Sequence, residues 1–116
     1  MLAVLPVLAV ASAAPSSAWQ PDGRRRDVAV AARKFVFEPS TIDVNEGDLV
    51  RVTLRADDIA HSLTIDEYRI AKRASPGRPV TFEFQADRAG TFKFYCSLQI
   101  DEGCRQMQGT LVVHPR

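Results

Sequence analysis

The residue types that bind metal ions most readily are few in this chain, and they are grouped. The sequence contains two cysteines, two histidines and two methionines. Cys96 ends an alternating apolar segment, and Cys104 and Met107 follow in the loop before the last such segment. His61 opens an earlier segment, three residues after the turn-like pair at 57–58. One imidazole and three sulfur donors would therefore meet if the fold brought these two places to one end of the domain.

Such a donor set favours a soft metal ion. Thiolate and thioether ligands prefer Cu(I), and imidazole also suits copper. Zinc could use the same residues, although a thioether would be an unusual zinc ligand. The other histidine, His114, lies beside the C-terminus, and Met1 is the initiator, so we expect neither to be a ligand.

The elements that must position these residues are short and alternating. From residue 27 onward, apolar and polar residues alternate in short runs that turn residues separate, which is typical of strands. Residues 67–79 are the least strand-like, and we expect a helical turn or an irregular segment there. About seven short strands favour an all-β, Greek-key β-sandwich. The predicted strand regions are 28–37, which holds one strand or two, 41–44, 49–54, 61–65, 80–84, 91–96 and 109–114.

The N-terminal segment predicts export. Residues 1–14 are apolar and rich in small side chains, as in a secretory signal peptide. A bilayer span needs about 20 apolar residues, and this run is shorter and contains Pro6. We therefore expect a signal peptide at 1–18, a linker at 19–27 and one domain at 28–116, in a periplasmic or secreted protein with no membrane span after cleavage. The net charge of +1 indicates no nucleic-acid partner.

The two cysteines have a second interpretation. In exported proteins a pair of cysteines commonly forms a disulfide. Cys96 and Cys104 are separated by a short loop, so a bond between them is sterically reasonable. That bond would staple the loop and remove both thiolates. A metal site and a disulfide both remain open at this point.

Several segments, in the same order, resemble those of cupredoxins. The segment at 58–62, Asp-Ile-Ala-His-Ser, is similar to the one that supplies the first histidine ligand. The segment at 90–97, Gly-Thr-Phe-Lys-Phe-Tyr-Cys-Ser, is similar to the strand that delivers the cysteine ligand. Residues 35–39 with 42–48 look like the opening of the domain, and 107–113 resembles the methionine ligand and closing strand. The resemblance implies a cupredoxin-like fold over residues 31–113.

Within that family, the spacing after Cys96 looks most like the copper-binding domain of cytochrome c oxidase subunit II and of nitrous oxide reductase. Their loop reads Cys-x3-Cys-x3-His-x2-Met. When its first cysteine is aligned with Cys96, its second cysteine falls at Ile100, its histidine at Cys104 and its methionine at Met107. A binuclear centre is therefore not expected, and a mononuclear blue site would lack its second histidine. The resemblance implies a histidine-depleted site for one copper ion, formed by His61, Cys96, Cys104 and Met107.

Three functions follow from this interpretation. The first is electron transfer by an exported, monomeric copper protein with a redox or copper-exchange protein as partner. The second is Cu(I) trafficking or storage through the same residues. The third is a metal-free sandwich with a Cys96–Cys104 disulfide. An enzymatic role would need an open coordination position and a substrate pocket, neither of which the sequence shows, so electron transfer or copper binding is favoured over catalysis. Asp101 and Glu102 are adjacent loop residues, and we interpret them as solvated charges rather than as an acid–base pair.

Overall fold

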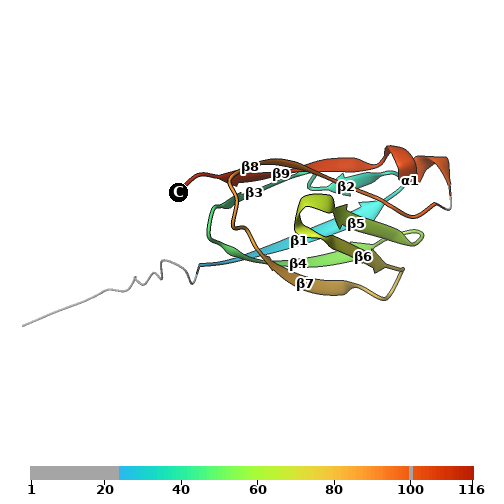
Figure 1. The fold of residues 1–116 in the computed structure, drawn as a ribbon. Coiled ribbons are helices and arrows are strands. Elements are labelled where there is room, and N and C mark those ends of the chain that lie inside the picture. The colour runs from blue at the N-terminus through green and yellow to red at the C-terminus, as the bar shows by residue number, and fades with distance from the viewer. Residues whose placement is uncertain (1–23, 100) are drawn as a thin grey trace, which may run out of the picture.

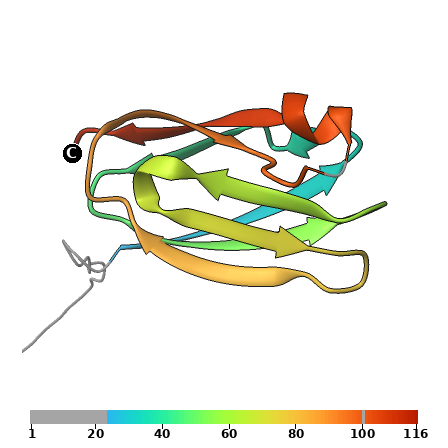
Figure 2. The ribbon, with the colours of Figure 1, turned by 45° about the vertical axis from the view of Figure 1, so that its right-hand side comes forward.

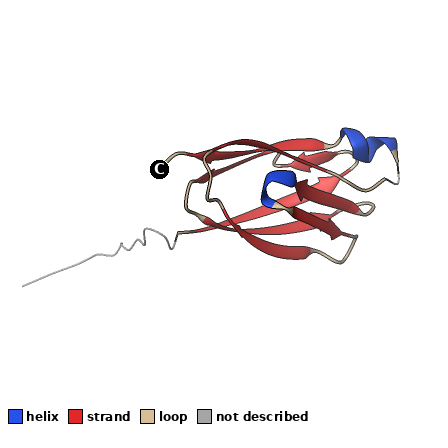
Figure 3. Cartoon of the chain, viewed as in Figure 1, coloured by secondary structure: helices blue, strands red, loops and turns tan. Residues whose placement is uncertain are grey.

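The computed structural model describes residues 24–99 and 101–116. The predicted signal peptide and residues 19–23 of the predicted linker lie outside this part of the chain, as does Ile100. The described residues form nine strands in two sheets, with one short helix and one 3₁₀ turn (Figures 1 and 3). The predicted all-β sandwich is confirmed.

Each sheet combines strands that are distant in sequence. One sheet has the order β2–β1–β4–β7, with β1 at Arg25–Arg33, β2 at Val36–Glu38, β4 at Leu49–Ala56 and β7 at Val80–Gln85. The other has the order β3–β9–β8–β5–β6, with β3 at Thr41–Asn45, β5 at His61–Ile65, β6 at Ile70–Ala74, β8 at Gly90–Tyr95 and β9 at Gln108–His114. β1–β4 and β3–β9 are parallel pairs, and the other pairs are antiparallel.

Alternation of apolar and polar residues explains why these segments form a sandwich. In β4, Val50, Val52 and Leu54 are buried between the sheets, whereas Arg51 and Thr53 are exposed. Successive side chains of a strand point to opposite faces, so one face enters the core. Each buried Val or Leu stabilises the fold by about 1.5–3 kcal/mol.

The structure differs from the sequence-based expectation in two places. β6 lies within 67–79, where no strand was predicted, and the 3₁₀ turn η2 (Asp66–Tyr68) provides the expected helical turn. Only the two ends of β6, Ile70 and Ala74, are buried, so this edge strand has no alternating pattern. β1 begins at Arg25, inside the predicted linker, and pairs there with the start of β4.

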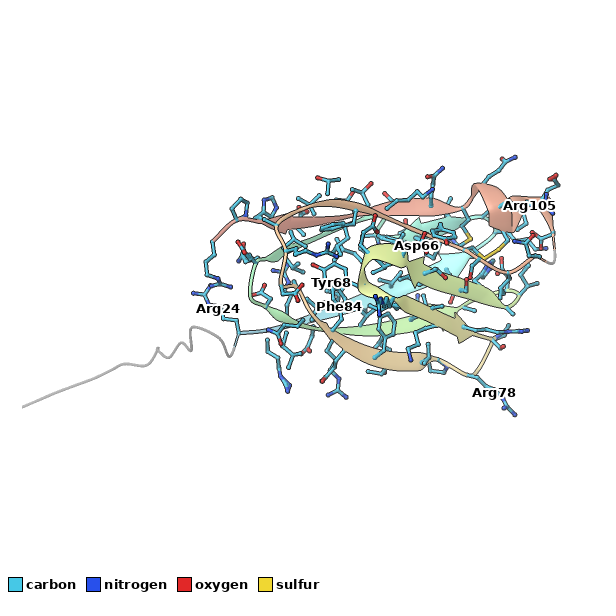
Figure 4. All side chains as sticks on the ribbon, in the orientation of Figure 1. Arg24, Asp66, Tyr68, Arg78, Phe84 and Arg105 are labelled. Atoms are coloured by element: carbon cyan, nitrogen blue, oxygen red, sulfur yellow. A yellow bond between two sulfur atoms is a disulfide. The ribbon has the colours of Figure 1, made fainter. Side chains whose placement is uncertain are left out.

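The two ends of the sandwich carry different features. The C-terminus and the first described residue, Arg24, lie toward one end (Figures 1 and 4). Helix α1 (Glu102–Gln106), the β1–β2 connection and the start of β5 lie at the other, which we call the site end (Figures 1 and 2). Within residues 24–99 and 101–116, no helix is long and apolar enough to cross a bilayer.

Candidate metal centre

The two cysteines are joined in a disulfide at the site end. Cys96 follows β8 and Cys104 lies in α1, with Cα atoms 5.2 Å apart (Figure 4). Asp101 caps α1, since its carboxylate accepts a hydrogen bond from the Cys104 N–H at 2.8 Å. The Cys96 N–H donates to the Met107 carbonyl at 3.1 Å. These contacts fold the 96–107 loop back on itself and bring the two sulfurs together.

In this state both cysteines are oxidised, so neither supplies a thiolate. No group of three or more His, Cys, Asp or Glu side chains in the described part of the chain is arranged to hold a metal ion. The structure thus has the disulfide that the sequence left open as an alternative. Cys96 and Cys104 meet the requirement for metal ligands only after this bond is reduced.

His61 has the surroundings of a metal ligand. Its side chain is 1% exposed. Nε2 lies 2.8 Å from Asp58 Oδ1, while Nδ1 is buried and has no hydrogen-bond partner among the described residues. An ionised carboxylate only accepts hydrogen bonds, so in the neutral imidazole Nε2 carries the hydrogen and Nδ1 keeps a free lone pair. Metal-binding histidines are commonly held by a carboxylate in this way.

Three donors hold the Asp58 carboxylate in its ionised form. Burial acts to raise the pKa of Asp58, but hydrogen bonds from the backbone N–H groups of Lys34 and Ile59 and from His61 outweigh it and lower the pKa to about 2. The Lys34 and Ile59 bonds are both 2.7 Å long. Asp58 is therefore charged at neutral pH and fixes the orientation of the imidazole.

Strand register places His61 and Cys96 on the same side of their sheet. β5 and β8 are neighbours, with Thr64 opposite Tyr95. Because side chains alternate along each strand, His61 and Cys96 both project to the side opposite Thr64 and Tyr95. That side faces the core, where Cys96 and Cys104 are 3% and 2% exposed. Met107 is fully buried in the same cluster. The fold therefore gathers all four predicted residues at the site end.

Phe35 covers the imidazole, a contact that no motif in the sequence predicted. Its ring meets the His61 ring edge-on, with centroids 6.4 Å apart. A Cβ added to Gly103 would overlap the Phe35 ring, so this ring packs directly on α1. Phe35 is nevertheless 38% exposed. It links His61 to the helix that carries Cys104.

The remaining histidine lies away from this centre. His114 ends β9, is exposed, and its Nε2 lies 2.9 Å from Asp43 Oδ1. Its neighbour in the parallel strand β3 is Asn45. These contacts are consistent with its exclusion from the predicted ligand set.

Comparison with known proteins places the chain in a family. The family model described as a cupredoxin-like domain matches residues 2–113. The chain belongs to the cupredoxin-like family. Cytochrome c oxidase subunit 2 of Thermus thermophilus is 27% identical over 86 residues, which are 74% of this chain and 64% of that protein. Nitrous-oxide reductase of Stutzerimonas stutzeri is 26% identical over 98 residues, 81% of this chain and 15% of that protein. The predicted resemblance is confirmed.

A solved structure supports the same fold. Auracyanin A, described as a "blue" copper protein from Chloroflexus aurantiacus, superposes on this cupredoxin-like chain with a TM-score of 0.65 at 15% identity. The match covers 78% of this chain and 99% of auracyanin A. This chain spans less than two thirds of the length of the two sequence relatives above.

Proposed function

We propose that this protein is an exported copper-binding domain that acts in electron transfer. It binds one copper ion through His61, Cys96, Cys104 and Met107 once the Cys96–Cys104 disulfide is reduced. The observation that carries the proposal is the buried, unpartnered Nδ1 of His61.

The His61 imidazole is better explained by a metal than by structural need. An unsatisfied buried acceptor costs about 1–3 kcal/mol. The chain nevertheless buries His61 almost completely and uses Asp58 to hold the opposite nitrogen. A copper ion would bind the free lone pair of Nδ1, and the Asp58 hydrogen bond would hold the ring in the orientation that presents this nitrogen to the ion.

The two sulfurs are suited to the same ion. A disulfide brings both sulfur atoms to one place, so reduction would leave two thiols side by side. Met107, whose N–H donates to the Cys104 carbonyl at 3.2 Å, begins the return to β9 and would supply the thioether. Copper would contribute one-electron redox chemistry. Cys96 would be the principal thiolate, Met107 the weak donor, and Cys104 would replace the second imidazole of a blue site.

The relatives support this assignment. Auracyanin A is described as a "blue" copper protein, and the sequence relative from Thermus thermophilus is a subunit of cytochrome c oxidase. We infer that the partner of this domain is a redox protein or a copper-exchange protein outside the cytoplasm.

A second function, Cu(I) trafficking or storage, is favoured by the sulfur content of the site. Three sulfurs and one imidazole stabilise Cu(I) over Cu(II), which opposes rapid cycling between the two states. A metal-free sandwich with the Cys96–Cys104 disulfide is the third candidate. It leaves the unpartnered Nδ1 of His61 unexplained.

Copper titration of the fully reduced protein separates the three functions. We expect one copper per chain. An intense thiolate charge-transfer band with Cu(II) would support electron transfer, whereas a colourless protein that retains one Cu(I) would support trafficking or storage. Absence of bound copper after complete reduction would contradict both and leave the metal-free sandwich.

Two variants test the ligand assignment. Cys96→Ser should abolish any coloured site. Cys104→His should change the spectrum toward that of a blue copper centre, because it restores the second imidazole. An unchanged spectrum for Cys104→His would mean that Cys104 is not a ligand.

A further inference from the structure

The free edges of the two sheets lie together on one side of the sandwich. β6 ends one sheet and β7 ends the other, and within the described residues each pairs with a single strand (Figures 1 and 2). A groove of about 640 Å³ runs between them, lined by residues 68–72 and 81–84. An unpaired strand edge presents backbone N–H and C=O groups to which another strand can bind.

The groove combines apolar surface with this free backbone. Ile70 and Phe82 line it but are buried, so its accessible apolar surface comes mainly from the half-buried rings of Tyr68 and Phe84. The rings of Tyr68 and Phe84 pack together with centroids 5.0 Å apart, and both are marked in Figure 4. An extended segment in the groove could therefore pair with β6 and direct every second side chain onto apolar atoms.

The β6 side of the groove is positively charged. Arg69 and Lys72 line it, and Arg73 and Arg78 follow outside the lining. All four side chains are exposed, and none of them forms an ion pair with a described residue. Glu83 is the one acidic residue in the groove lining, and its carboxylate lies 3.8 Å from Arg51 of β4. The cations of β6 are thus left without neutralising partners.

We propose that this groove binds an extended acidic segment of a partner protein, which adds as a strand to β6. Its acidic side chains would pair with Lys72 and its neighbours, and its apolar side chains would contact the groove. The lined part of β6 lies opposite the second half of β5, where Ile70 pairs with Ile65. This inference goes beyond the copper site and does not depend on it.

The cations have an alternative explanation, because charged side chains on an edge strand also prevent unwanted pairing. The two explanations predict different behaviour toward peptides.

The test uses the full ¹⁵N-labelled chain in its disulfide-bonded form without copper. The probes are three peptides of equal length: alternating Glu and Val, alternating Lys and Val, and alternating Glu and Pro.

We expect the Glu–Val peptide to bind and to shift amide resonances of β6 and the groove. Its affinity should fall as salt is added. Lys72→Glu combined with Arg73→Glu should weaken binding by about tenfold or more. The matched variant Arg25→Glu with Arg26→Glu, which reverses two exposed cations of β1, should bind normally. Thermal unfolding would verify that both variants are folded.

The remaining outcomes would overturn the proposal. Equal binding of the Glu–Pro peptide would mean simple charge attraction without strand addition, because proline cannot supply the backbone N–H groups. Binding of the Lys–Val peptide, shifts away from β6, or no binding of the Glu–Val peptide would mean that the cations only protect the edge.

Discussion

At the scale of single residues, His61 and Asp58 form the pair on which copper binding depends most. We predict that Asp58→Asn lowers the Cu(I) affinity of the reduced protein by about 10–100-fold, the usual effect of losing a carboxylate that orients a metal-binding histidine. A competition titration with a Cu(I) chelator would measure this. Asp57→Asn is the matched control, since the Asp57 carboxylate accepts a hydrogen bond from Arg55 Nε at 2.9 Å and does not contact His61. Equal losses in both variants would refute a specific role of Asp58.

Gly103 is required by its contact with Phe35. We predict that Gly103→Ala lowers the free energy of unfolding by about 1–3 kcal/mol, because the new Cβ would overlap the Phe35 ring. The same substitution in a Phe35→Ala background should cost much less, and urea unfolding of the four proteins completes a double-mutant cycle. Additive effects would show that the two residues are not in contact.

At the scale of elements, α1 depends on its N-terminal cap. This helix has only five residues, and the Asp101 carboxylate bonds to the Cys104 N–H within it. We predict that Asp101→Ala destabilises the disulfide-bonded protein by about 0.5–2 kcal/mol. Glu102→Ala provides the control, because Glu102 is exposed in the same turn. If the two substitutions lowered the urea midpoint equally, the Asp101 carboxylate would not be acting as a cap.

The edge strand β6 illustrates the limit of sequence patterns for elements. β4, in the centre of its sheet, alternates strictly between buried and exposed residues and was predicted from that alternation. β6 pairs on one side only, and its middle residues 71–73 are exposed. A strand at the edge needs little apolar surface, so its sequence carries no period that distinguishes it from a loop.

At the scale of the whole molecule, thiol redox state and copper should both control stability. The disulfide joins residues eight positions apart. We predict that its reduction lowers the free energy of unfolding by about 2–3 kcal/mol through the entropy of the opened loop. Stoichiometric Cu(I) should then restore stability, because a ligand that binds only the folded state stabilises it.

Urea unfolding of the oxidised, reduced and Cu(I)-loaded forms would measure both effects. His61→Ala should lose stability on reduction but regain less with Cu(I). The double variant Cys96→Ser with Cys104→Ser should respond to neither treatment. Stabilisation of that double variant by Cu(I) would place the ion elsewhere in the chain.

Sequence alone determined the sandwich and the four candidate donors. Alternation and turn residues are local properties of the chain, and they report burial without knowledge of the partner strand. The spacing of Cys96, Cys104 and Met107 is also visible in the sequence, since it depends only on their positions along the chain. His61 was identified through its resemblance to a cupredoxin segment.

The tertiary structure decided how these residues meet. Spacing allowed either thiols or a disulfide for Cys96 and Cys104, and the return of the chain from β8 through α1 brought their Cα atoms to 5.2 Å. The free Nδ1 of His61 and the Phe35 contact likewise depend on connections between separate strands. Such contacts join residues whose distance is set by the packing of two sheets, and no local period in the sequence encodes that distance.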